Sequence, residues 1–246
     1  MMRKTEEFFV GLDIGSNKIA ACVGEVDEED TLTIVGVGSS FVTGVRKGVV
    51  SEIEETVSGI SEAIEIAERT SGLSINRATI NINGGHIVST NSRGVIAVGR
   101  ADKEVTRNDI LRADEASQAI QLPANKDILQ IIPRFYQIDN QERVKDPLGM
   151  TGVRLEVESH IVLISEKNGR DLNRCLAQAG IRVEQMFVSP IASAKAVLNK
   201  RQQELGCVVV DIGAETTGIV VYQDEAIVYT KVFPVGAASV TNDLAI

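Results

Sequence analysis

The stretches VGLDIGSN (residues 10–17) and VVVDIGAE (residues 208–215) are two apolar runs that both end in Asp-Ile-Gly. The apolar, β-branched residues favour buried strands, and the glycine after each strand permits a tight turn. Aligning the two stretches places Asp211 on Asp13 and Gly213 on Gly15. This internal repeat predicts that the chain contains two related units.

The residues after each repeat continue the parallel. After the first, strands are expected over 18–26 and 31–40, followed by a helix over 53–71 that a capping box at 51–54 would begin. After the second, strands are expected over 217–223 and 226–236, with a helix from 238 onward. The pattern predicts two α/β domains that face each other across a cleft.

The middle of the chain has a different pattern of predicted strands and helices. Residues 86–100 read as two short strands, Thr106–Asp109 as a capped helix start, and 127–139 and 153–165 as long strands. We interpret 85–164 as a small α/β subdomain inserted into the first domain. The predicted parts of the chain are then residues 1–84 and 165–204 for the first domain, 85–164 for the insertion, and 205–246 for an incomplete second domain.

The first domain continues after the insertion with three more elements. These are a helix over 168–179 that Gly180 ends, a strand over 181–189, and one helix over 190–205 with proline in its first turn. With the strand expected over 78–83, the domain reads as β-β-β-α-β-α.

Composition excludes several classes of function. The net charge of −9 argues against a nucleic-acid partner, which requires a basic surface. Two histidines, His86 and His160, are too few for a histidine-rich zinc site or to favour a Ser-His-Asp triad. Three separated cysteines form no disulfide framework, and no apolar run approaches the length of a membrane span, so a cytoplasmic chain is expected.

The repeated turns carry the candidate chemistry. Successive N–H groups of a glycine turn converge into an anion-binding concavity, and an adjacent aspartate suits Mg²⁺ that keeps most of its water shell. Two such turns facing each other would clamp a polyphosphate, with Asp13 and Asp211 beside the metal. The alternative is two ordinary hairpins with Asp-x-Gly turns.

The two turns resemble the phosphate loops of the actin, Hsp70 and sugar-kinase superfamily. Two stretches outside them, NINGGHIVSTNSRGVIAVGR (81–100) and VKDPLGMTGVRLEVESHIV (144–162), are similar to FtsA, the actin-like family of bacterial cell division. The resemblance runs from about residue 8 to residue 246 and implies an actin-like duplicated, ribonuclease-H-like fold.

The resemblance also implies function. FtsA proteins bind ATP and Mg²⁺ and polymerise into protofilaments, and the inserted subdomain would be the surface for self-association. They tether FtsZ and other division proteins to the cytoplasmic face of the inner membrane at the division site. The FtsZ site and the C-terminal amphipathic membrane helix would lie beyond residue 246, so the chain resembles an N-terminal fragment.

Residue by residue, the resemblance assigns two phosphate loops. The first maps to Asp13, Gly15, Ser16 and Asn17, and the second to Asp211, Gly213 and Thr217. Lys18 either adds charge near the phosphates or lies in solvent. Gly236 and Thr241 match a glycine and a threonine after the third strand of the second domain, in either a ligand-binding or a structural role.

Departures from the family pattern bear on activity. Ala214 and Glu215 stand where glycines are common, and Gly218 replaces an aspartate. Ser189 stands where hydrolytic relatives place a glutamate, which leaves in-line attack poorly assisted and favours at most a slow ATPase. We expect this chain alone to bind ATP weakly or not at all. An actin-fold adaptor of a pilus or secretion assembly, and a phosphotransferase on the same fold, are the alternatives.

Overall fold

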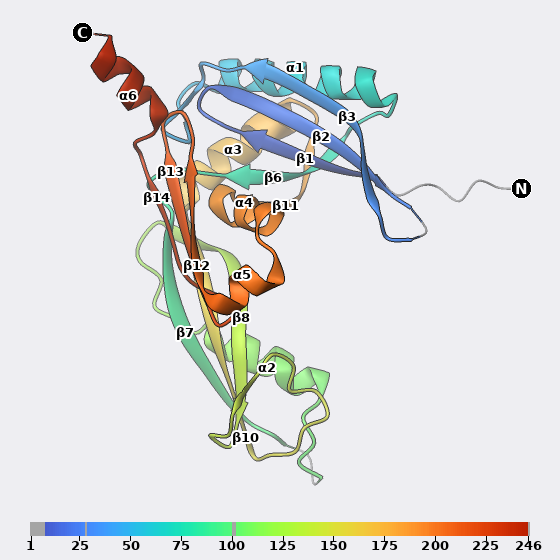
Figure 1. Cartoon of the computed structure of the whole chain (residues 1–246), viewed down its shortest axis with the longest axis vertical. Helices are drawn as coiled ribbons and strands as arrows, with labels where there is room; N and C mark the ends of the chain where they lie inside the picture. Colours follow the sequence, from blue (N-terminus) through green and yellow to red (C-terminus); the bar gives the residue numbers. More distant parts are fainter. Residues whose placement is uncertain (1–7, 28, 100–101, 246) are drawn as a thin grey trace, which may run out of the picture.

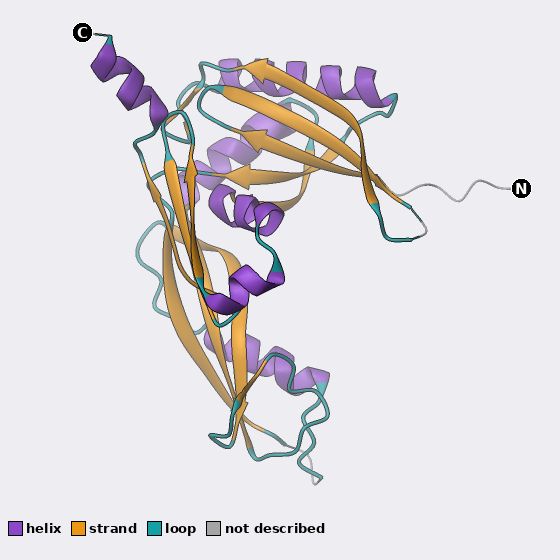
Figure 2. Cartoon of the chain, in the orientation of Figure 1, coloured by secondary structure: helices purple, strands orange, loops and turns teal. Residues whose placement is uncertain are grey.

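The computed structural model describes residues 8–27, 29–99 and 102–245. Arg100 and Ile246, the last residues of two predicted segments, lie outside the described residues, as does the start of the predicted first domain at 1–7. Figure 1 shows a first sheet with helix α1 on its outer face, an inserted sheet that extends away from it, and a third sheet alongside the inserted one. Figure 2 shows helices set against the sheets, which confirms the α/β class.

The first sheet has the strand order β11-β6-β1-β2-β3. Strands β1, β2 and β3 are antiparallel neighbours, whereas β6 and β11 run parallel to β1. The bounds are β1 Phe8–Ile14, β2 Lys18–Val26, β3 Leu32–Phe41, β6 Arg77–Ile82 and β11 Arg182–Val188. A short hairpin, β4 Val45–Arg46 and β5 Val49–Val50, precedes α1. The carboxyl ends of β1, β6 and β11 therefore meet at one edge of the sheet.

Helix α1, Ile53–Ser71, covers one face of this sheet. A side chain at Gly38 on β3 would collide with the Ala63 carbonyl oxygen of the helix, so the glycine permits the close approach. The predicted capping box at 51–54 is wrong, because the helix begins after Glu52 and Ser51 Oγ donates to the Gly44 carbonyl oxygen instead. Gly72, in the left-handed conformation, ends the helix.

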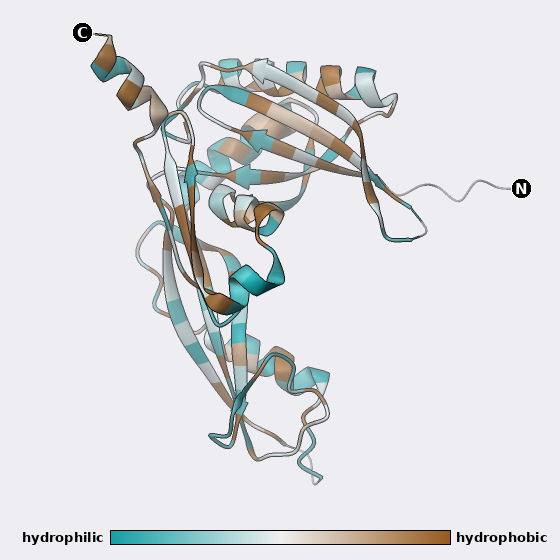
Figure 3. Cartoon of the chain, viewed as in Figure 1, coloured by the Kyte–Doolittle hydropathy of each residue, from teal (hydrophilic) through white to brown (hydrophobic). Residues whose placement is uncertain are grey.

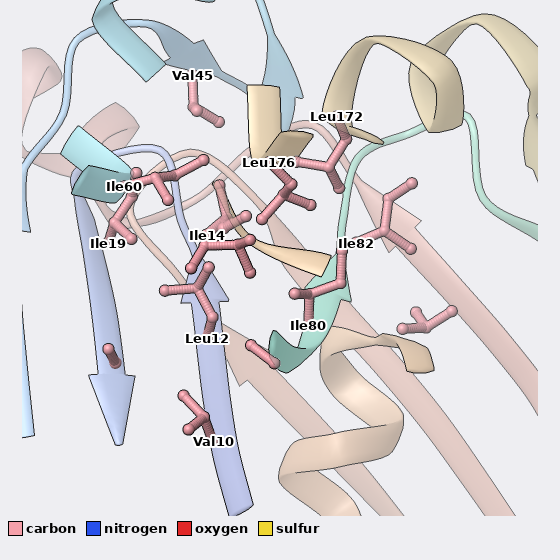
Figure 4. Packing of buried hydrophobic residues seen from close by; sticks show 14 of the residues in the cluster. Val10, Leu12, Ile14, Ile19, Val45, Ile60, Ile80, Ile82, Leu172 and Leu176 are labelled. Atoms are coloured by element: carbon pink, nitrogen blue, oxygen red, sulfur yellow. The ribbon is translucent and has the colours of Figure 1, made fainter. Parts of the chain in front are cut away.

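The main hydrophobic core lies between the first sheet and helices α1 and α3 (Figure 4), and it continues to α4 and the third sheet. Alternate residues of β1 and β6 point into it because side chains of a strand alternate between the two faces. Burial of each large aliphatic side chain contributes about 1.5–3 kcal/mol. The residues labelled in Figure 4 are Val10, Leu12, Ile14, Ile19, Val45, Ile60, Ile80, Ile82, Leu172 and Leu176.

The inserted sheet has the order β7-β10-β8-β9, with helix α2, Arg107–Ser117, against it. Its strands are β7 Val88–Ala97, β8 Lys126–Ile138, β9 Arg143–Val144 and β10 Arg154–Ser165. The prediction of two short strands over 86–100 is wrong: β7 is continuous through Gly94, where a Cβ would collide with the backbone of α2. The predicted cap at Thr106 is confirmed by reciprocal hydrogen bonds with Asp109.

The chain returns to the first domain through α3, Glu166–Gln178, which begins two residues earlier than predicted because Ser165 caps it. The single helix predicted over 190–205 is wrong. It is divided into α4, Ser189–Val197, and α5, Lys200–Leu205. Leu198 is extended, and the Asn199 side chain caps α5 by accepting from the Gln202 N–H.

The third sheet, β12-β13-β14, contains the second repeat. Its elements are β12 Cys207–Ile212, β13 Thr217–Gln223, β14 Ala226–Phe233 and helix α6 Ala237–Leu244. Hydrophobic residues run along its strands in Figure 3, and on β12 the side chains of Val208, Val210 and Ile212 are exposed. In the part of the chain that the structure describes, no helix combines the length and the apolar character that crossing a membrane requires.

Side chains of the inserted sheet hold the outer strand of the third sheet. Ser89 Oγ on β7 donates to the Thr230 carbonyl oxygen at 2.8 Å and accepts from the Thr230 N–H at 3.1 Å. Asn91 Nδ2 donates to the Val228 carbonyl oxygen at 3.1 Å. The buried ring of His160 on β10 bonds to both Asn91 and Thr230. The insertion therefore supports the edge of β14 through polar contacts.

Candidate functional site

The two Asp-Ile-Gly segments form the same hairpin. In the first, Ile14 pairs with Ile19, and the Gly15 N–H donates to the Lys18 carbonyl oxygen at 3.1 Å. In the second, Ile212 pairs with Thr217, and the Gly213 N–H donates to the Thr216 carbonyl oxygen at 2.8 Å. The alignment of the two repeats in sequence is thus also an alignment of strand register and turn geometry.

Asp13 lies where the carboxyl ends of β1, β6 and β11 meet. Asn81, at the end of β6, donates from Nδ2 to Asp13 Oδ1 and to Ser189 Oγ, the latter at 2.7 Å. The Asn81 Oδ1 accepts from the Ile14 N–H at 2.6 Å, so the amide holds both the backbone and the carboxylate of the first loop. Polar groups at the carboxyl ends of parallel strands are the usual place for a ligand site in an α/β sheet.

Asp211 reaches the same cleft from the second repeat. Ser193 Oγ on α4 donates to Asp211 Oδ2 at 2.8 Å, so this helix orients the second carboxylate. The cleft has a volume of about 590 Å³, and Asp13, Asn81, Ser189, Ser193 and Asp211 are among its lining residues. Of the described residues that line it, Asp13 and Asp211 are the charged ones.

The two carboxylates influence each other. The pKa of Asp13 is raised, first by burial and then by the negative charge of Asp211, while the Asn81 hydrogen bond and the Lys18 charge act in the opposite direction. A dication between the carboxylates would offset this repulsion. Within the described chain no cluster of three or more potential metal ligands occurs. Two carboxylates fit Mg²⁺, which takes few protein ligands and completes its shell with water and phosphate oxygens.

The two loops also contact the turn between β4 and β5. The Lys47 N–H donates to Glu215 Oε2 at 2.6 Å, and the Gly48 N–H donates to Ser16 Oγ at 2.8 Å. Asn83 Nδ2 donates to Thr216 Oγ1 at 3.0 Å. The second loop is therefore joined directly to the first domain, and the Glu215 carboxylate points to the hairpin.

Two glycines of the second repeat have steric explanations. A Cβ on Gly218 would lie 2.6 Å from Pro190 Cβ, so α4 leaves no room for a side chain at this position. A Cβ on Gly236 would lie 2.5 Å from the Gly213 carbonyl oxygen. The next residue, Ala237, donates its N–H to that same oxygen at 2.9 Å, so the start of α6 supports the second loop.

The other predicted residues lie at the margins of the loops. The Asn17 carbonyl oxygen accepts from the Val42 N–H at 3.2 Å, and Lys18 is exposed at the start of β2. Thr217 Oγ1 donates to the Val235 carbonyl oxygen at 2.8 Å, and Thr241 Oγ1 donates to the Ala237 carbonyl oxygen at 3.4 Å, within α6. In this structure these two threonines bond to the chain's own backbone.

Sequence reasoning did not find three parts of the site: Asn81, Ser193 and the β4–β5 turn. Asn81 had a usable signal, because it is a polar residue at the end of the otherwise alternating run ATINI and precedes a glycine turn. Ser193 and the turn at Lys47 had no such signal, since their roles depend on contacts across the fold.

Comparison with known proteins agrees with the geometry. A family model described as the SHS2 domain inserted in FtsA matches residues 84–163, and a model for the cell division protein FtsA matches residues 208–246. A curated FtsA from Pseudomonas aeruginosa is 41% identical over 239 residues, which is 97% of this chain. Over nearly its whole length, the chain is similar to FtsA proteins.

Other FtsA proteins are similar over the same region. The Bacillus subtilis protein is 36% identical over 98% of this chain, and the Escherichia coli K12 protein is 33% identical over 100% of it. This chain spans 57% of the length of the Pseudomonas FtsA, 54% of the Bacillus FtsA and 58% of the Escherichia FtsA.

Solved structures show the same actin-like fold. A chain of a PilM–PilN type IV pilus biogenesis complex matches with a TM-score of 0.66 at 14% identity, covering 96% of this chain and 64% of that one. The ethanolamine utilization protein EutJ from Carboxydothermus hydrogenoformans matches with a TM-score of 0.55 at 17% identity, covering 98% and 57%. At these identities the likeness concerns fold alone, so it gives no support to a role in pilus assembly.

Proposed function

We propose that this FtsA-like chain holds Mg²⁺ and ATP between its two Asp-Ile-Gly loops and is a nucleotide-dependent subunit of an actin-like polymer in cell division. The observation that supports this most is the meeting of Asp13 and Asp211 in one cleft, each from an equivalent hairpin. Two like charges that face the same cleft repel each other unless a cation accompanies them, and the repeated turns supply the anion-binding backbone beside them.

The residues of the cleft have distinct roles in this proposal. Asn81 orients Asp13, and Ser193 orients Asp211, through the hydrogen bonds described above. Bound Mg²⁺ would neutralise phosphate charge. Ser189, whose hydroxyl accepts from Asn81, is not a base that could assist attack by water. The nucleotide is therefore proposed to be a structural and switching ligand that is hydrolysed slowly at most.

The inserted subdomain is proposed to mediate self-association. Leu111 on α2 and Leu148, Met150 and Val153 in the loop before β10 are exposed apolar residues of the insertion, with Leu111 60% exposed. A contiguous apolar patch favours a protein contact, and these four side chains are proposed to supply one. Filaments built this way would carry FtsZ and other division proteins to the inner membrane at the division site, with an amphipathic helix of the family outside this chain as the anchor.

Calorimetric titration with ATP in the presence of Mg²⁺ tests the nucleotide site. The wild-type chain should bind with a dissociation constant on the order of millimolar, and Asp13→Asn and Asp211→Asn should each weaken binding roughly tenfold. Asp171→Asn, which changes a carboxylate on α3 that pairs with Lys167, is the matched control and should leave binding unchanged. Equal affinity in all four proteins would refute the site.

Assembly is tested separately by light scattering and electron microscopy with ATP. Leu111→Asp should abolish filaments because it places a charge in the proposed contact. Leu205→Asp, at an exposed leucine of α5 outside the insertion, should leave them intact. Filaments of equal abundance in both variants would contradict self-association through the insertion.

A further inference from the structure

The turn between β4 and β5 presents two backbone N–H donors to the two loops. Lys47 and Gly48 have φ values of 50° and 74°, both in the left-handed region. One N–H meets the Glu215 carboxylate and the other meets Ser16 Oγ, at 2.6 and 2.8 Å.

The turn is held in this conformation by its surroundings. Lys47 adopts a backbone conformation that is unfavourable for a residue with a side chain. A Cβ on Gly48 would lie 2.7 Å from the Gly84 nitrogen, so the turn packs closely on the end of β6. A carboxylate that accepts from the Lys47 N–H compensates for the unfavourable conformation, because hydrogen bonds to an ionised acceptor are strong.

Glu215 comes from the other repeat, in the second loop. Its neighbour Thr216 accepts from Asn83 of the first domain, so two adjacent residues attach the second loop to the first domain. The Glu215 carboxylate of the second loop thus accepts from one N–H of the turn, and the Ser16 hydroxyl of the first loop accepts from the other. These are the same two loops whose facing turns are proposed to bind phosphate.

We propose that Glu215 is an internal anion that latches the second loop to the β4–β5 turn and opposes the binding of nucleotide phosphates between the two loops. This inference rests on the proposed function. Phosphates between the loops would repel the Glu215 carboxylate, and binding requires that carboxylate to leave the Lys47 N–H. Glu215 therefore lowers nucleotide affinity and couples its binding to release of the turn.

Two measurements test the latch. Amide hydrogen exchange of Lys47 should be roughly tenfold faster in Glu215→Ala than in wild type, because a charge-assisted hydrogen bond is lost. Mg²⁺-ATP should bind Glu215→Ala roughly tenfold more tightly, with Glu215→Gln intermediate since it keeps an acceptor but loses the charge. Glu204→Gln, an exposed carboxylate of α5, is the control and should match wild type in both.

The outcomes separate the latch from the nucleotide site. If Glu215→Ala binds Mg²⁺-ATP no more tightly than wild type while Asp13→Asn still weakens binding, the latch is overturned and the nucleotide site stands. Unchanged exchange at Lys47 in Glu215→Ala also overturns the latch. If neither wild type nor Glu215→Ala binds Mg²⁺-ATP at millimolar concentration, the proposed function is refuted, and the effect of Glu215 on binding with it.

Discussion

Replacing His160 with glutamine should make the stability of the protein less dependent on pH. His160 is fully buried on β10, where Asn91 of β7 and Thr230 of β14 bond to its two ring nitrogens at 2.8 and 3.0 Å. Asn91 uses its Nδ2 for the Val228 carbonyl oxygen, so its Oδ1 faces the ring and accepts from Nδ1–H. The ring is then neutral, and Nε2 accepts from the Thr230 hydroxyl.

The magnitude follows from the pKa of His160. Burial, followed by the nearby Arg134 charge, lowers that pKa from 6.5 to about 4. Between pH 6.5 and about pH 4, His160 is therefore protonated in the unfolded chain and neutral in the folded chain. The stabilisation is fully present above pH 6.5 and is lost as the pH falls toward 4. Between pH 8 and pH 5 the loss of unfolding free energy is about 2 kcal/mol.

Urea unfolding of wild type and His160→Gln at pH 8 and pH 5 measures this difference. The wild type should lose about 2 kcal/mol more than the variant over this range. His86, whose pKa burial and the Lys126 charge lower to about 4, is the matched comparison. His86→Gln should remove a similar share of the dependence. An equal loss in wild type and His160→Gln would refute the burial of a neutral ring at this junction.

Two further substitutions test the fold and the site. Gly38→Ala should destabilise the protein by about 1–3 kcal/mol in urea unfolding, because its Cβ would collide with the Ala63 carbonyl oxygen. Gly11→Ala, with nothing within 4 Å of its Cβ, is the control, and equal costs would contradict the packing of α1 on β3. Asn81→Ala should cost about 1–3 kcal/mol through the unpaired Ile14 N–H, and should also weaken Mg²⁺-ATP binding. Unaltered binding by a folded Asn81→Ala would remove Asn81 from the site.

The repeat was the most predictable part of the fold, because strand periodicity and a glycine turn are local properties. Asp13 and Asp211 could be identified by comparing two stretches of sequence, and the register of both hairpins followed. The FtsA resemblance likewise anticipated the inserted subdomain, since residues 84–163 match its family model.

The errors arose where tertiary contacts override local signals. Residues 86–100 read as two short strands, but β7 is continuous through Gly94, where α2 passes too close for a side chain. Ser51 and Glu54 had capping-box spacing, but the Ser51 hydroxyl bonds to Gly44 across the β4–β5 hairpin. The division of α4 from α5 depends on Asn199, whose side chain caps α5. In the sequence this asparagine lies inside a run that has helical periodicity throughout, so the break was not predicted.

Glu215 shows the same limit at the site. From the sequence, Glu215 was a departure from the glycines common in a phosphate loop. Its bond to the Lys47 N–H depends on a turn that lies 168 positions away in the chain, so no local pattern could have predicted it. The consequence for nucleotide binding follows from that contact.

The most direct test of the account is whether one metal ion contacts both loops. Mn²⁺ with ATP, used in place of Mg²⁺, should broaden the amide resonances of Gly15 and Gly213 together in the wild-type chain. Asp13→Asn and Asp211→Asn should each reduce the broadening at both glycines, because the two carboxylates share the ion. Broadening at one loop alone, or broadening that survives both substitutions, would contradict a shared metal-phosphate site.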